Sequence, residues 1–210
     1  MITPEPKLAL RGPVHRHPAL TITLHWLSAL AVFVALGVAW TRAALDDPAP
    51  RAWLMSVHQG AGVLVLALLL ARVGTRLAVR RDAAAQPLPR LMQFAAHATH
   101  GVLYAVLLAL PLLGWALANA HGHDVRLPGL ATLPSLVPAD PDLAESIEAW
   151  HVGLAWLLSG VIVLHAGAAL FHHLVRRDAV LLSMLPPATA PRAVPRGPAQ
   201  PRHAQPSRTF

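Results

Sequence analysis

The sequence predicts an all-α membrane protein, a bundle of four transmembrane helices with both termini in the cytoplasm. Four separate stretches are apolar over the length of about 20 residues that a helix needs to cross a bilayer. None of them alternates polar and apolar residues as a half-buried strand would. The chain is 55% apolar and only 13% charged, which is too apolar for an ordinary soluble domain.

The four expected spans have histidine as their main polar residue. They occupy residues 22–40, 57–77, 94–118 and 149–175. The first run is longer than the apolar core of a signal peptide, about 7–15 residues, and it contains His25, so we expect a retained helix. The connecting loops are expected at 41–56 and 119–148 on the outer side and at 78–93 on the inner side. The 119–148 loop, rich in Pro and Gly, is expected to lack regular structure apart from a short helix leading into the fourth span.

The predicted organisation has three parts: a cytoplasmic N-terminal segment (1–20), a transmembrane domain (21–185) and a cytoplasmic tail (186–210). The tail contains seven prolines and four arginines, a composition typical of disorder. No internal repeat is evident.

The basic residues predict the orientation. Fourteen of the seventeen Lys and Arg residues fall on the side that holds both termini, and only Arg42, Arg51 and Arg126 fall on the other side. By the positive-inside rule both termini are cytoplasmic, in a multi-pass protein of the cell inner membrane. The net charge of +7 is then mostly a topology signal, so we expect membrane lipid around the chain and no nucleic-acid partner. The absence of cysteine excludes disulfides and thiolate metal sites.

Four of the thirteen histidines form two pairs. The two members of each pair lie at the same depth but in different spans. His151 and His165 are fourteen residues apart on the fourth span, so they lie about 21 Å apart along the axis and point within about 40° of the same direction. His25, in the inner half of the first span, matches the depth of His165. His58, at the outer end of the second span, matches that of His151. We call His25 and His165 the inner pair, and His58 and His151 the outer pair.

Paired histidines suggest a chemistry that a single one does not. A polar side chain within a span usually faces the bundle interior, and a single histidine there is most often a packing residue. Two imidazoles that face each other across a bundle would suit the iron of a bis-histidine haem. Small residues at 60–62, 153 and 166–169 would leave room for a flat macrocycle, although such residues are also ordinary helix contacts.

Two arginines and two further histidines lie near the inner pair. Arg72 and Arg76 follow His58 by fourteen and eighteen residues, so they share its helix face at the depth of the inner pair. They are candidates for binding haem propionates. The alternative is that they only anchor the helix at the cytoplasmic side by the positive-inside rule. His97 and His100 open the third span. Each is a competing ligand of the inner iron or a hydrogen-bonding group near the edge of a haem or quinone.

The remaining histidines carry weaker signals. His172 and His173 are expected in an interfacial cluster beside Arg176 and Arg177, where a quinone contact is a second reading. His121 and His123 are expected in an exposed outer loop, with weak binding of a divalent metal as the alternative.

Seven segments occur in a specific order along the chain. They are LHWL at 24–27, VHQGAG at 57–62, the RxxxR of Arg72 and Arg76, HATHGVLY at 97–104, PLLGW at 111–115, WH at 150–151 and LHAGAALFHHLVRRD at 164–178. Any one of them alone would be a weak signal. As an ordered set spanning roughly residues 18–186, they resemble the bacterial cytochrome b561 family.

The resemblance implies a four-helix membrane cytochrome with two haem b groups. The iron ligands would be His25 and His165 for the inner haem, and His58 and His151 for the outer haem, the same pairs that depth suggests. It also implies electron exchange with the quinone pool of the respiratory chain. Some members resemble superoxide oxidases, which pass an electron from superoxide outside to ubiquinone. That activity needs an electropositive outer approach, whereas the outer loops here are net acidic.

The expected function is therefore electron transfer across the membrane between an unidentified donor and an acceptor, with no residue assigned a catalytic role. Two axial imidazoles leave no open position at an iron, which favours outer-sphere transfer over substrate chemistry. One alternative is the haem b anchor of a larger dehydrogenase or hydrogenase, which would have a redox partner subunit. Another is a histidine-lined metal or proton transporter, but the four apolar runs contain no acidic relay residue. The third is a structural membrane protein whose histidines only pack.

Overall fold

The structure is a computed structural model, and it describes residues 16–78, 89–127 and 131–186. Four long helices follow one another along the chain: α1 (Ala19–Ala43), α2 (Pro48–Ala78), α3 (Arg90–Ala120) and α4 (Pro141–Phe171). Each is long and apolar enough to cross a membrane. The predicted all-α four-helix architecture is therefore confirmed. The predicted disordered tail, from residue 187 onward, and most of the 78–93 loop lie outside the described residues.

The helices extend beyond the apolar runs, so the predicted loop boundaries were wrong. The 41–56 loop shrinks to residues 44–47, and the helix expected to lead into the fourth span is continuous with α4 from Pro141. An apolar run marks the part of a helix that lipid surrounds. The helix itself can continue farther, provided that the backbone groups at its ends find hydrogen-bond partners. Asp140 does this for α4, because its side chain accepts hydrogen bonds from the backbone N–H groups of Asp142 and Leu143.

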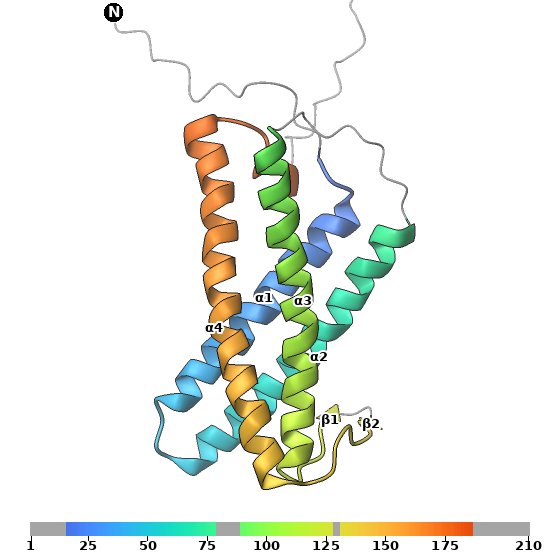
Figure 1. Cartoon of the computed structure of the whole chain (residues 1–210), viewed down its shortest axis with the longest axis vertical. Coiled ribbons are helices and arrows are strands. Elements are labelled where there is room, and N and C mark those ends of the chain that lie inside the picture. Colours follow the sequence, from blue (N-terminus) through green and yellow to red (C-terminus); the bar gives the residue numbers. More distant parts are fainter. Residues whose placement is uncertain (1–15, 79–88, 128–130, 187–210) are drawn as a thin grey trace, which may run out of the picture.

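The helices run up and down, so both described chain ends lie at the same end of the bundle (Figure 1). The backbone N–H of His17 donates to the carbonyl of Ser183 at 3.2 Å, which joins the two ends directly. We call this the terminal end and the opposite one the hairpin end. The closest backbone packing is between α1 and α2 and between α3 and α4. In Figure 1 the first of these pairs runs obliquely to the second.

A small folded loop closes the hairpin end, where no strand was expected. Strands β1 (Arg126–Leu127) and β2 (Ala131–Thr132) pair antiparallel. The buried side chain of Asn119 ties this loop to α3, because its Nδ2 donates to the His123 carbonyl and its Oδ1 accepts from the Leu136 N–H. The prediction of an irregular loop missed this pairing, since two-residue strands leave no period-two pattern to read.

The apolar core lies halfway along the bundle. It is built from buried residues of all four helices: Ala31, Val32, Val65, Val106, Leu110 and Leu158. On α4, Leu158 stands midway between His151 and His165. The core therefore separates the level of the outer pair from the level of the inner pair.

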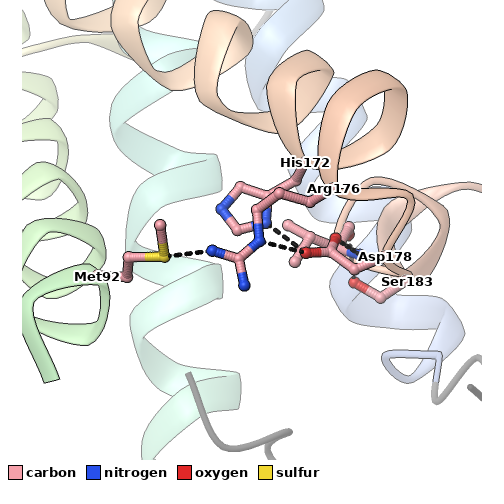
Figure 2. A network of polar contacts seen from close by, with 6 residues as sticks. Met92, His172, Arg176, Asp178 and Ser183 are labelled. Carbon is pink, nitrogen blue, oxygen red and sulfur yellow. Dashed lines mark hydrogen bonds and ion pairs between the residues drawn. The ribbon is translucent and has the colours of Figure 1, made fainter. Parts of the chain in front are cut away.

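Four residues hold the terminal end together, and we call them the terminal clasp: Met92, His172, Arg176 and Asp178 (Figure 2). After α4 the chain makes a π-helical turn, His172–Arg176, and Arg177 then takes a left-handed conformation with φ of 55°. This turn brings Asp178 back against the helix end. Its carboxylate accepts from His172 Nδ1 at 2.6 Å and lies 3.5 Å from Arg176 Nε. The Nη1 of Arg176 donates to the sulfur of Met92 on α3 at 2.7 Å.

Candidate functional site

The inner pair consists of one histidine from α1 and one from α4, and their rings meet near the terminal end. The rings of His25 and His165 have centroids 6.3 Å apart and planes 64° apart. Both residues are half-buried. Close backbone packing joins α4 to α3 rather than to α1, so the two imidazoles approach each other across a wider space between the helices.

The outer pair has the same form near the hairpin end. The centroids of His58 and His151 are 6.1 Å apart, and their planes make an angle of 73°. The Nδ1–H of His58 donates to the carbonyl of Ala35 on α1 at 2.9 Å. A carbonyl can only accept, so the proton of a neutral His58 is on Nδ1 and its Nε2 keeps a free lone pair. This is the arrangement that orients a histidine as a metal ligand.

The spacing within each pair fits two imidazoles on one iron. A bond from an imidazole nitrogen to a metal is about 2 Å long, and the nitrogen is about 1 Å from its ring centroid, so two opposed ligands have centroids about 6 Å apart. The observed 6.1 and 6.3 Å agree with this distance. In addition, the buried Nδ1 atom of His25 has no hydrogen-bond partner in the described part of the chain. A bound ion or cofactor nearby is one explanation for such an atom.

His100 lies beside the inner pair but in a different relation to it. Its ring centroid is 5.3 Å from that of His165, at 79°, closer than opposed ligands of one iron would be. Its Nδ1 donates to Ala96 of its own helix at 2.7 Å, and the Nδ1 of His97 does the same to Gln93 at 2.6 Å. Both side chains are exposed. His100 is therefore a neighbour of the inner pair rather than one of two opposed ligands. His97 lies closer to the start of α3.

Arg72 and Arg76 share one partner that the sequence analysis did not single out. Their guanidinium carbons lie 5.6 and 5.8 Å from the ring centroid of Tyr104 on α3. Such cation–π contacts hold a guanidinium in place without neutralising it. The one available signal was spacing, because Tyr104 follows His100 by four residues and so lies on the same face of α3.

The remaining predicted residues are dispersed. His172 belongs to the terminal clasp, and its partner Asp178 was not predicted because it lies beyond the helix, where no periodicity applies. His121 and His123 lie exposed at the hairpin end. Within the described residues no three His, Asp or Glu side chains are arranged to hold a metal ion. Of the basic residues at the hairpin end, Arg126 is 3.9 Å from Asp124, and Arg51 donates to the Leu45 carbonyl.

Comparison with known proteins identifies a family for this chain. The family described as Prokaryotic cytochrome b561 matches residues 16–187. The chain is 34% identical to the Probable superoxide oxidase CybB of Yersinia pestis, over 81% of this chain and 96% of that protein. It is 31% identical to the Cytochrome b561 homolog 1 of Escherichia coli K12, over 82% and 98% of the two chains. It is also 28% identical to the Cytochrome b561 homolog 2 of the same strain, over 81% and 91%.

These relatives match over nearly their whole length, and the range of the family match, residues 16–187, contains all four helices. Membership implies haem b binding, and the four apolar helices make this a multi-pass protein of the inner membrane. The chain therefore belongs to the prokaryotic cytochrome b561 family and is a transmembrane b-type cytochrome.

Proposed function

We propose that the chain carries two haem b groups and passes single electrons between them, connecting the quinone pool to a redox partner at the opposite face of the membrane. The observation that supports this best is the presence of two histidine pairs with the same ring separation, 6.3 and 6.1 Å, at two levels of one bundle. His25 and His165 would bind the inner iron, and His58 and His151 the outer iron.

The haem irons would supply the change between ferric and ferrous states, and the protein residues set its conditions. His25 and His165 would hold one iron and His58 and His151 the other, and two imidazoles on an iron would leave no position for oxygen or substrate, which favours outer-sphere transfer. The mid-bundle core places buried aliphatic side chains between the two levels, an environment that disfavours water. Arg72 and Arg76, which both contact Tyr104, would supply the positive charge that can bind the propionates of the inner haem.

The charge distribution supports a cytoplasmic location for the terminal end. The described basic residues there are Arg16, Arg72, Arg76, Arg90, Arg176 and Arg177. At the hairpin end the described residues carry mainly Asp and Glu, with Arg42, Arg51 and Arg126. By the positive-inside rule the outer pair then faces the periplasmic side and the inner pair the cytoplasm.

Transmembrane electron transfer can be tested in sealed vesicles that contain the purified protein. An impermeant reductant outside and ferricyanide trapped inside should react at a rate that rises with the protein content, because electrons would cross through both haem levels. His25→Ala and His151→Ala should each abolish this rate. A rate equal to that of protein-free vesicles would contradict the proposal. Anaerobic reduction of the haem band by ubiquinol would separately test the link to quinone.

Superoxide is a second candidate donor, since a relative that is 34% identical is named a probable superoxide oxidase. Oxidation of superoxide to O₂ releases one electron, so two such events, with two protons, would reduce one ubiquinone. Arg42 and Arg51, near the loop 44–47, are the basic groups available to attract the anion. If superoxide is the donor, a superoxide source should reduce ubiquinone only in the presence of this protein, and Arg42→Glu should slow the reaction. Unchanged kinetics in that variant would show that Arg42 does not attract superoxide.

A further inference from the structure

Gly114 of α3 lies directly against the imidazole of His151. A methyl group at Gly114 would have its carbon 3.1 Å from Cε1 and 3.6 Å from Nδ1 of that ring. Carbon atoms in good contact are about 3.5–4.0 Å apart, so the first of these contacts would require the ring to move. The other helical glycines in the described residues have no such neighbour within 4 Å.

The backbone of α4 has little freedom to move away instead. Ala144 and Ile147 precede His151 by seven and four residues, so they lie on the same helix face. They are 1% and 9% exposed and pack with the buried Ala120 at the end of α3. The two helices are thus clamped together just before His151, and a group added at Gly114 would be accommodated by rotation or displacement of the imidazole.

We propose that Gly114 is a positioning residue of the outer site, whose missing side chain lets the His151 ring face His58. The inference rests on the proposed ligand role of the outer pair. Cε1 is bonded to both ring nitrogens, so any shift of this atom carries the coordinating nitrogen with it. The separation of 6.1 Å and the angle of 73° between the two rings would both change.

The first test compares Gly114→Ala with Gly160→Ala in the purified, haem-loaded protein. Gly160 is an exposed glycine of α4 with no neighbour within 4 Å, and it lies nine residues from His151, on the opposite face of the helix. Both changes favour the helical state, so helix propensity cannot explain a loss. Gly114→Ala should alter the low-spin ferric resonance or the midpoint potential of the outer haem, or lower its occupancy by at least half. The inner haem and the Gly160→Ala protein should match the wild type.

Three results would overturn the proposal. An outer haem with the wild-type resonance, potential and occupancy in Gly114→Ala would show that the ring tolerates a methyl group. Equal changes at both haems would show that the glycine serves bundle packing in general. An effect of the same size in Gly160→Ala would show that the outer site is sensitive to any such change.

A double-mutant cycle keeps the test informative even if Gly114→Ala folds poorly. Thermal unfolding is measured for the wild type, Gly114→Ala, His151→Ala and the double variant. If Gly114 acts through the His151 ring, the alanine at 114 should lower the unfolding temperature only when the imidazole is present. The same drop in the His151→Ala background would contradict the proposal.

Failure of this inference is distinguishable from failure of the proposed function. If the wild-type protein binds no outer haem, the proposed function fails first. If it binds two haems and Gly114→Ala leaves both unchanged, only the positioning role is lost.

Discussion

His58 and His151 face each other, but the protein holds their rings by different means. His58 is fixed by a hydrogen bond from Nδ1 to the Ala35 carbonyl. The buried Nδ1 of His151 lies near the Leu110 backbone of α3 without a hydrogen bond of good geometry, and its ring lies against Gly114. The His58 ring is thus held by a well-formed hydrogen bond and the His151 ring mainly by packing, so the two should respond differently to substitution around them.

Replacing His151 with alanine should remove the outer haem and leave the inner haem in place. The two sites lie about 21 Å apart along α4 and share no ligand. Haem content per chain and the reduced-minus-oxidised spectrum of the purified variant would measure this. His97→Ala is a suitable control, because that exposed side chain donates to Gln93 of its own helix. Loss of both haems from a correctly inserted His151→Ala protein would argue against independent sites.

Replacing Arg72 with glutamine should lower the midpoint potential of the inner haem, because a nearby positive charge disfavours the oxidised and more positive form. At an effective dielectric constant of about 20, a unit charge about 10 Å away contributes roughly 1.7 kcal/mol, about 70 mV for one electron. Redox titration of the haem band would measure the shift. Arg90→Gln, an exposed arginine at the start of α3, should leave the potential unchanged. If the potential and the occupancy of the inner haem were unaltered in Arg72→Gln, the arginine would have no role at the haem and would only help to orient the helix in the membrane.

At the scale of elements, α4 connects all parts of the site. It contributes one histidine to each pair, and it ends in the terminal clasp. Its register therefore sets the depth of both pairs at once. The clasp fixes that register at one end, and the contact of Ala144 and Ile147 with α3 fixes it at the other.

Breaking the clasp should destabilise the bundle at its terminal end. Asp178→Asn removes the charge that pairs with His172 and Arg176, in a site where the carboxylate is 13% exposed. Hydrogen bonds to charged groups of this kind are each worth about 1.5–3 kcal/mol, so we expect a clear drop in the thermal unfolding temperature. Asp124→Asn is the matched control, because Asp124 and Arg126 are 59% and 77% exposed and an exposed pair contributes little. Equal stability of both variants would contradict a structural role for the clasp.

The elements that lipid dictates were the most predictable from the sequence. The four apolar runs predicted α1 to α4, because a spanning helix must be apolar over its whole lipid-covered length. The positions of helix ends and the β1–β2 pairing were not predictable in the same way, because caps and loop contacts decide them. The residues of the site divide in the same way, into those that follow from position along a helix and those that depend on contacts. The depth of each histidine pair can be read from spacing along a straight helix, whereas Tyr104, Gly114 and Asp178 act through contacts that only the packed structure reveals.

At the scale of the whole molecule, the structure places two polar levels in an apolar bundle with a core of aliphatic residues between them. A histidine inside a membrane span is expensive unless it has a partner or a function. In the inner pair the buried Nδ1 of His25 has no hydrogen-bond partner among the described residues, so side-chain packing alone does not explain that histidine. The proposed binding of one iron at each level would account for the depth, the spacing and the pairing of the four histidines.

The measurement that tests this account most directly is the haem b content of the purified wild-type protein, expressed in cells with ample haem and analysed together with its reduced-minus-oxidised spectrum. We expect two haems per chain, both low-spin and b-type. A correctly inserted protein without a haem spectrum would contradict it, and a single haem per chain would contradict the two-level arrangement.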